Sequence, residues 1–568
     1  METPLKRCLN LFDLVLLGIG HMVGAGIFVI TGTVAKDIAG PGIVLSYLLA
    51  GVAAVLSALC YAEFGARVPK AGSAYTYTYV TIGELGAFLI GWNMILENLI
   101  GSASVARAWS GSFDALFNGA IRNGTLEHVG SVNVPWLSRY MDFIALGVVL
   151  LVVVFVAAGA KVSTTVNSVL TIINLAILCL IIGLGFYLAD SRNWTNQKIG
   201  GFLPYGFSGV IAGAGSCFYA YIGFEGIAIA GEEAKNPART IPMATGLAMI
   251  LVSLLYVGCS ATLTLMVPYS SVDVAAPFPT AFGLHGNMWA KRVVAIGALV
   301  GISTSLLGSL FTLPRSIYAM ASDGLLFRVL AYVHPRTQTP ILSIFVFGAV
   351  AGIVALLVDL EVLVELLSIG TLLSFTIVAA SVIVLHYQPV DKCQFQLRPD
   401  ASSASLADQG EDSTTDLETS NSDKKKMLKG SQSHDDIGKL KKNFLDLPIL
   451  RSMPPGYASI ASVTLMTVFM VSFWLLVLHG TAYLKAGAWW SIVLLAVVSL
   501  GLIASFLLLC VHEQNTSFLT FQVGSSLSSS SSSSSIIEHL SSSIIIDHRV
   551  YDYVSAIKLD SLPASIEP

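Results

Sequence analysis

Two glycine-rich stretches inside apolar runs are the parts of this chain best suited to hold a molecule with two opposite charges. The first, GIGHMVGAGIF, spans residues 18–28, and the second, AGAGSCFYAYIGFEG, spans residues 212–226. Glycine costs a helix about 1 kcal/mol relative to alanine, so these clusters predict that both helices are interrupted. An interrupted helix exposes N–H groups that favour anions and carbonyl groups that favour cations. Such a pair suits the carboxylate and ammonium groups of an amino acid.

Both stretches also have a purely structural interpretation. Small residues at four-residue spacing pack helices closely in membranes, and Gly20 and Gly24 have this spacing. The two stretches fall, however, in the first and sixth long apolar runs, which are corresponding positions in a transporter with inverted repeats. This coincidence favours a binding site over packing alone. A nucleotide site is not indicated, because no strand precedes the first stretch and its spacing differs from the dinucleotide-binding motif.

Two acidic residues lie deep within apolar runs. Glu97 in MILENLIG is in the middle of the third run, and Glu225 in IGFEG follows the second glycine-rich interruption. A charge at the centre of a membrane helix costs about 2.5–3.5 kcal/mol, so each acid needs an explanation. Either carboxylate could neutralise a cationic group of a substrate or take part in gating. The alternative is a pairing with Arg107 or with a hydroxyl group.

The residue pattern indicates no other chemistry. The sequence contains no nucleophile–base arrangement and no residues at metal-ligand spacing, so we expect neither an enzyme nor a cofactor or metal site. It also lacks the filter motif of a channel. The expected partners are a small-molecule amino acid and the lipid bilayer, with no nucleic acid, and the oligomeric state is left open.

The composition identifies an integral membrane protein. The 568 residues are 54% hydrophobic and 12% charged, with a mean hydropathy of +0.75, whereas soluble domains contain about 25% charged residues. A helix needs about 20 residues to cross the ~30 Å hydrocarbon core. Apolar runs that predict an all-α polytopic protein with twelve spans occur near 11–35, 42–66, 82–118, 141–158, 163–189, 206–230, 240–267, 291–322, 341–358, 361–387, 456–480 and 487–511.

The predicted spans divide the chain into five parts. We expect a cytosolic N-terminus at 1–10, a ten-helix core at 11–387, a disordered cytosolic loop at 388–455, two further helices at 456–511 and a low-complexity tail at 512–568. The loop contains SNSDKKKMLKG and is too hydrophilic to bury a core. With this loop inside and an even number of spans, both termini are predicted to be cytosolic. No cleavable signal peptide is expected.

Two N-glycosylation sequons fall on the predicted outer side. They are Asn123-Gly-Thr and Asn193-Trp-Thr. A third, Asn515-Thr-Ser, would lie inside and stay unmodified. The first two agree with the predicted orientation and predict a glycoprotein.

Four long motifs carry a resemblance to a known family. They are CYAEFGARVPKAGSAYTYTYVTIGELGAFLIGWN at 60–93, SVARAWSGSFDALF at 104–117, CFYAYIGFEGIAIAGEEAKNPARTIP at 217–242 and SLLGSLFTLPRSIYAMASDGLLFRVL at 305–330. In this order they resemble the cationic amino acid transporters of the amino acid-polyamine-organocation superfamily. The similarity covers residues 1 to about 390 and resumes over 456–511. Details in METPLKRCLN, GHMVGAGIF and LENLIG are nearest to one particular member.

The resemblance implies both a fold and an activity. The fold is a LeuT-like core of two inverted five-helix repeats, followed by extra helices. The activity is sodium-independent transport of arginine, lysine and ornithine by alternating access at the plasma membrane. Family members usually have two more spans than we predict here.

The resemblance also assigns positions to the substrate. They are Gly24, Ala25, Gly26, Tyr219, Ala220, Ile222 and Ser309. The backbone of the first three is expected to hold the carboxylate, and the carbonyl groups of the next three to receive the ammonium group. Tyr219 would also close over the ligand as an aromatic lid, and Ser309 would leave room for a long basic side chain. Without the resemblance, packing explains the tyrosine, and a bond to the carbonyl one turn back explains the serine.

A second set of positions concerns gating and charge. It comprises Glu84, Glu97, Asn174, Phe224, Glu225 and His21. Glu84 matches the GELxAF motif of the family, and Phe224 belongs to the second interruption. Asn174 stands where bacterial proton-coupled relatives carry a lysine, and a neutral amide cannot titrate. This favours facilitated movement driven by the membrane potential, which supplies about 2.3 kcal/mol per 100 mV for one positive charge.

His21 stands in the first glycine-rich stretch, where family members have serine or glycine. An unperturbed imidazole titrates near about pH 6.5, and a positive imidazole would repel a cationic substrate. We hypothesise that transport of basic amino acids is weak or falls at acid pH.

Two functions remain open from the sequence. The first is a plasma-membrane facilitator for basic amino acids. The second is a non-transporting sensor or accessory protein that retains the transporter fold, for which the altered His21 and the missing spans are the reasons. Uptake measured on cells with confirmed surface expression separates the two.

Overall fold

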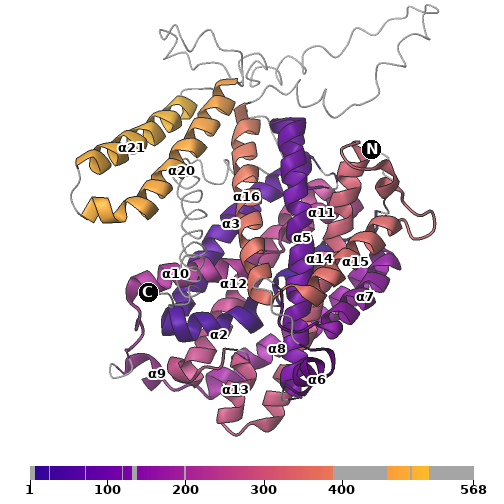
Figure 1. Cartoon of the computed structure of the whole chain (residues 1–568), viewed down its shortest axis with the longest axis vertical. Helices are drawn as coiled ribbons and strands as arrows, with labels where there is room; N and C mark the ends of the chain where they lie inside the picture. Colours follow the sequence, from indigo (N-terminus) through magenta and orange to yellow (C-terminus); the bar gives the residue numbers. More distant parts are fainter. Residues whose placement is uncertain are drawn as a thin grey trace, which may run out of the picture. The chain divides into compact units, whose positions relative to one another are not determined.

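The computed structural model describes residues 5, 7–24, 26–68, 70, 72–117, 119–130, 137–196, 200–274, 276–387, 457–485 and 489–510. These residues are almost entirely helical (Figure 1), and the only β-type pairings among them are isolated bridges. The predicted loop at 388–455 and the predicted tail at 512–568 lie outside the described residues.

The described residues belong to two compact units. The larger unit contains the helices before the predicted loop up to Ala379, and the second contains α20 and α21, which pack against each other. The α-helices within the described residues are α1 Leu11–Met22, α2 Thr31–Thr33, α3 Ile43–Arg67, α4 Ala74–Thr81, α5 Glu84–Leu116, α6 Ala120–Val129, α7 Phe143–Ala157, α8 Ala160–Tyr187, α9 Arg192–Thr195, α10 Gly206–Phe218, α11 Glu225–Ile229, α12 Pro237–Met266, α13 Pro277–Leu284, α14 Met288–Ser322, α15 Ile341–Leu357, α16 Leu360–Tyr387, α20 Tyr457–Lys485 and α21 Trp489–Cys510.

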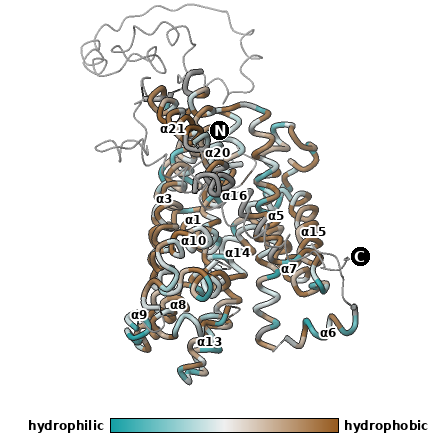
Figure 2. Tube along the Cα trace, turned by 60° about the vertical axis from the view of Figure 1, so that its left-hand side comes forward, coloured by the Kyte–Doolittle hydropathy of each residue, from teal (hydrophilic) through white to brown (hydrophobic). Residues whose placement is uncertain are grey.

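The helices match the predicted spans in position. Within the described residues, 7 helical segments are long and apolar enough to cross a membrane, and shorter apolar helices account for the other predicted runs. Figure 2 shows hydrophobic residues predominating along the long helices and hydrophilic ones gathering on the connections near α6 and α9. Each of the twelve predicted ranges overlaps one of these segments.

The first glycine-rich stretch interrupts its helix as predicted. Helix α1 ends at Met22, and Val23 leaves the helical region with φ −86° and ψ 89°. The chain resumes as a short π-helix, η1, at Gly26–Ile30. Ala25 lies outside the described residues. The interruption therefore falls inside the span that runs from Leu11 to Ile38.

The second glycine-rich stretch is interrupted in the corresponding place. Helix α10 ends at Phe218, a 3-10 turn, η5, spans Tyr219–Tyr221, and Ile222 is extended with φ −62° and ψ 135°. Gly223 has φ +123°, a conformation that side chains with a Cβ rarely adopt. Helix α11 then begins at Glu225. Both predicted interruptions are confirmed.

The packing interpretation of the first stretch is also confirmed. Helix α1 packs against α8, α12 and α14. A Cβ on Gly20 would overlap the Thr171 side chain on α8, and a Cβ on Gly24 would overlap Ser305 on α14. Gly20 and Gly24 therefore allow close helix contact at and beside the interruption.

Candidate functional site

A buried cavity lies between the two interruptions. His21 and Gly26 line it from the first interruption, and Tyr219, Ile222 and Glu225 line it from the second. A Cβ on Gly26 would overlap Ala220, so the two interruptions are in direct contact beside the cavity. Residues about 200 positions apart in the sequence thus form opposite walls of one cavity.

The remaining walls come from neighbouring long helices. Helix α5 contributes Glu97, and α14 contributes Ser305 and Ser309. The cavity has a volume of about 40 Å³, which is room for roughly three water molecules.

The sequence-predicted residues separate into three groups. Those that line the cavity are Gly26, Tyr219, Ile222, Ser309, Glu97, Glu225 and His21. Those that lie behind the lining and support it are Gly24, Ala220, Asn174 and Phe224. Glu84 is exposed at the first residue of α5 and does not line the cavity.

Glu97 presents a buried carboxylate to the cavity. Its side chain is 6% exposed, and Oε2 accepts a hydrogen bond of 3.3 Å from the Ser374 hydroxyl on α16. Oε1 has no hydrogen-bond partner among the described residues. A buried carboxylate with incomplete hydrogen bonding is costly, so a cation beside it would be favourable. The predicted pairing with a hydroxyl is confirmed for Glu97.

Glu225 is held by its own segment. Its Oε2 accepts a hydrogen bond of 2.9 Å from the Gly223 N–H, and the side chain is 4% exposed. The carboxylate thus closes the turn between η5 and α11, where a negative charge near the first turn of a helix is favourable. Glu225 also lines the cavity.

Arg107 is not the partner of either acid, so that predicted alternative is wrong. Its guanidinium donates to the Ala355 and Leu356 carbonyls and to the Ser138 hydroxyl. These carbonyls belong to the last turn of α15, which lacks helical acceptors and favours a cation. Arg107 therefore caps the end of α15 and does not neutralise either acid of the cavity wall.

Side chains of neighbouring helices bind the carbonyl groups freed by the first interruption. Asn174 on α8 donates from Nδ2 to the Val23 carbonyl at 2.9 Å. The Ser305 hydroxyl on α14 donates to the Gly20 carbonyl at 3.3 Å. Buried carbonyl groups without partners are costly, so these donors stabilise the end of α1 in its interrupted form. Asn174 is a fixed donor to the main chain.

Tyr256 on α12 joins the two interruptions, and the sequence analysis missed it. Its hydroxyl lies 2.9 Å from the Met22 carbonyl and 2.8 Å from the Ala220 carbonyl. One proton is available, so the two carbonyls share a single donor. The side chain is fully buried. A tyrosine in an apolar run is usually packed, and the only sequence signal is a hydroxyl that needs a buried partner.

Two of the three predicted ammonium acceptors already have donors in this conformation. The Tyr219 carbonyl accepts from the Ile222 N–H at 3.2 Å, and the Ala220 carbonyl accepts from Tyr256. Each carbonyl oxygen has two lone pairs, so a second donor can still bind. The Tyr219 side chain is half-buried on the cavity wall.

Phe224 packs in an aromatic cluster behind the second interruption. Its ring centroid lies 4.9 Å from that of Phe375 on α16 and 5.4 Å from that of Tyr61 on α3. Rings in such edge and tilted contacts add about 0.5–1.5 kcal/mol to their burial. The cluster fixes the side of the interruption that faces away from the cavity.

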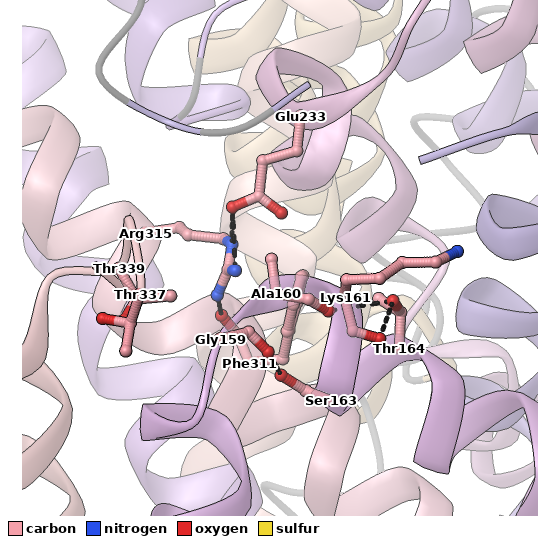
Figure 3. Close-up of polar contacts among 10 residues, drawn as sticks. All are labelled: Gly159, Ala160, Lys161, Ser163, Thr164, Glu233, Phe311, Arg315, Thr337 and Thr339. Carbon is pink, nitrogen blue, oxygen red and sulfur yellow. Dashed lines mark hydrogen bonds and ion pairs between the residues drawn. The ribbon is translucent and has the colours of Figure 1, made fainter. Parts of the chain in front are cut away.

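A buried ion pair anchors the segment that follows α11. Figure 3 shows the Arg315 guanidinium between the Glu233 carboxylate and the Phe311 carbonyl. Arg315 lies 2.8 Å from Glu233, and both side chains are 1% exposed. The Glu233 carbonyl also accepts from the N–H groups of Cys8 and Leu9. Residues near the start of the chain, the end of the second interrupted span and α14 therefore meet at Glu233.

The described residues contain no group of three or more His, Cys, Asp and Glu side chains that could hold a metal ion. The polar groups of the cavity are carboxylates, hydroxyls, one imidazole and main-chain groups. This set can bind a charged organic molecule through hydrogen bonds and opposite charge.

Comparisons with known proteins agree with this geometry. The family model for amino acid permease matches residues 9–403. This chain belongs to the amino acid permease family. A permease is a transporter and not an enzyme, and its helices make it a multi-pass membrane protein.

Named relatives of this permease are cationic amino acid transporters. "Cationic amino acid transporter 4" of Mus musculus is 47% identical over 527 residues, which cover 92% of this chain and 81% of the mouse protein. The Homo sapiens protein of the same name is 53% identical over 388 residues, covering 68% of this chain and 61% of the human protein. "Cationic amino acid transporter 4, vacuolar" of Arabidopsis thaliana is 38% identical, covering 68% of this chain and 64% of the plant protein. Transporter 4 is the member that the sequence details indicated.

The two sequons of this permease occupy the same end of the larger unit. Asn123 is exposed on α6, and Asn193 is half-buried on α9. Figures 1 and 2 both show α6 and α9 at one end of the helices. The Asn193 side chain donates to the Leu265 carbonyl at 2.7 Å. Asn123 is thus the more accessible of the two acceptors.

Proposed function

We propose that this chain transports cationic amino acids, such as arginine, lysine and ornithine, across the plasma membrane without sodium and by alternating access. In this proposal α1 to α16 form two inverted five-helix repeats, the interrupted spans are corresponding elements of the repeats, and both termini are cytosolic. Asn174 offers no titratable group, so the movement is facilitated and driven by the membrane potential. A glycan on Asn123 or Asn193 marks the outer side.

One observation carries this proposal: two interrupted helices face the same cavity, and two carboxylates line it. The interrupted main chain supplies groups for the carboxylate and ammonium of an amino acid. The incompletely bonded Glu97 supplies a counter-charge for a positive side chain. A substrate with three charged groups of this kind is a basic amino acid.

Uptake of radiolabelled amino acids by cells with confirmed surface expression tests the proposal. Arginine and lysine should accumulate equally in sodium and in choline medium, and accumulation should fall when potassium depolarises the membrane. Glu97→Gln should lower arginine uptake more than leucine uptake, because only arginine needs the counter-charge. Accumulation that requires sodium, or that ignores the membrane potential, would contradict this mechanism.

The size of the cavity favours a second candidate, a sensor that binds an amino acid without moving it. The walls leave about 40 Å³, and a hydrogen bond between His21 and Ser309 joins two of them. A sensor would bind radiolabelled arginine in purified form and show no flux in proteoliposomes. Flux at a rate that depends on the membrane potential would exclude it.

A further inference from the structure

We propose that His21 determines which amino acids the cavity accepts: its imidazole fills the part that a long substrate side chain needs. Short side chains fit beside the ring, and lysine or arginine enters only after the ring leaves Ser309. This inference rests on the proposed function, because it concerns the substrate range of the same site.

The location of His21 supports this role. It is the second-last residue of α1, directly before the interruption, and it is 7% exposed. Its Nε2 lies 3.1 Å from the Ser309 hydroxyl on α14. Both residues line the cavity. The ring therefore extends from the first interruption to α14 on the other side of the cavity.

Three glycines form a slot for the imidazole. A Cβ on Gly223 would lie 2.9 Å from His21 Cγ, and a Cβ on Gly226 would lie 2.9 Å from Nδ1. On α14, a Cβ on Gly308 would lie 2.6 Å from Cγ. Real Cβ contacts are longer than this, so any other residue at these positions would displace the ring. The second interruption and α14 are thus shaped around the side chain of the first.

The filled slot has a direct consequence for substrate size. With the ring in place, the cavity measures about 40 Å³, or roughly three water molecules. Replacing the imidazole with a smaller group extends the cavity along α14 towards Ser309. Pockets discriminate side-chain length by about 10–200-fold per methylene group, so a ring of this size suffices to select among amino acids.

The test compares size with charge at position 21. Equilibrium binding of radiolabelled arginine and alanine is measured on the purified full chain and on two variants. His21→Ser is short, whereas His21→Gln is uncharged and close to histidine in length. We expect the arginine-to-alanine affinity ratio to rise about tenfold in His21→Ser and less than about threefold in His21→Gln. His285→Ser changes an exposed histidine after α13 and should leave the ratio as it is.

Each outcome decides a specific point. An equal rise of the arginine-to-alanine affinity ratio in both variants would mean that the charge of His21, and not its size, determines the ratio. This result would overturn the proposal. Alanine binding with no rise in His21→Ser would also overturn it while leaving the proposed function intact. If no protein binds any amino acid, the proposed function fails as well.

A second variant covers the case in which His21→Ser does not fold. Ser309→Ala keeps the imidazole and removes its hydrogen bond, so the ring leaves the slot more easily. We expect a rise in the arginine-to-alanine ratio of about two- to threefold. An unchanged ratio in a folded Ser309→Ala protein would contradict the proposal.

Discussion

The two interruptions that face the cavity are stabilised in different ways. In the first, the carbonyls of Gly20, Met22 and Val23 accept hydrogen bonds from side chains of α14, α12 and α8. The second has one such bond, from Tyr256 of α12 to the Ala220 carbonyl, and its turn is closed within its own segment by the positive φ of Gly223 and by the Glu225 carboxylate, which accepts from the Gly223 N–H. A segment bonded to three neighbouring helices moves only with them, whereas a turn closed mainly by its own residues can change its angle and lose fewer bonds. We therefore expect the second interruption to act as the hinge.

Loss of the ion pair between Glu233 and Arg315, which follows the second interruption, should have the largest effect on stability. Glu233→Ala leaves the Arg315 guanidinium buried without its counter-charge, which costs about 3–5 kcal/mol. The thermal stability of the purified protein, followed by size-exclusion chromatography after heating, should fall strongly. The double variant Glu233→Leu with Arg315→Met replaces the pair with apolar groups and should recover most of the loss. A single variant as stable as the parent would show that the segment is anchored elsewhere.

The local closure of the second interruption can be broken at Gly223. Gly223→Ala places a Cβ on a backbone with φ +123°, and this Cβ would also overlap the His21 ring. The two effects together should lower the free energy of unfolding by about 3 kcal/mol, the upper end of the usual range for backbone strain. Arginine binding should be lost, because the turn that faces the cavity can no longer form. Gly246→Ala on α12 has open space around its Cβ and should be neutral or slightly stabilising. If Gly223→Ala and Gly246→Ala bound arginine equally well, the positive φ of Gly223 would not be needed for the site.

The bond that joins the two interruptions can be removed at Tyr256. Tyr256→Phe removes the hydroxyl that the Met22 and Ala220 carbonyls share. The free energy of unfolding should therefore fall by about 1–3 kcal/mol. Substrate affinity should fall as well, because the two walls lose their common tie. Tyr205→Phe removes an exposed hydroxyl that bonds Lys36 and should leave affinity unchanged. Unchanged affinity in a folded Tyr256→Phe protein would show that this hydroxyl does not hold the two walls of the cavity together.

The smallest effect on stability is expected when one of the three side-chain hydrogen bonds to the first interruption is removed. Ser305→Ala removes a hydroxyl that bonds the Gly20 carbonyl at 3.3 Å, and the other two ties remain. The stability should fall by about 0.5–1.5 kcal/mol. Ser208→Ala, an exposed serine on α10, should change it less. A loss of stability as large as that of Tyr256→Phe would mean that the three hydrogen bonds do not act independently.

The interruptions were predictable because their cause is local. Clusters of glycine weaken a helix wherever it lies, and both clusters are visible in the apolar runs that contain them. Buried carboxylates could be identified in the same way, since Glu97 and Glu225 stand alone in apolar sequence.

The ties of the interruptions were not predictable because they join distant positions. Tyr256 and Met22 are 234 positions apart, and His21 and Ser309 are 288 apart. No spacing rule links such residues, and a tyrosine or serine in a span is ordinary by itself. The same limit led to the wrong expectation for Arg107, whose acceptors at the end of α15 come from a helix some 250 positions away. Side-chain partners across helices depend on packing that the sequence pattern does not specify.

We infer that the two interrupted spans form one amino acid site, and a density map of the full chain with bound arginine is the decisive measurement. Both interruptions should lie at Val23–Gly26 and Tyr219–Glu225, with ligand density between them and the guanidinium beside Glu97. Continuous helices through both stretches, or arginine bound away from this cavity, would show that the interrupted spans do not form the site.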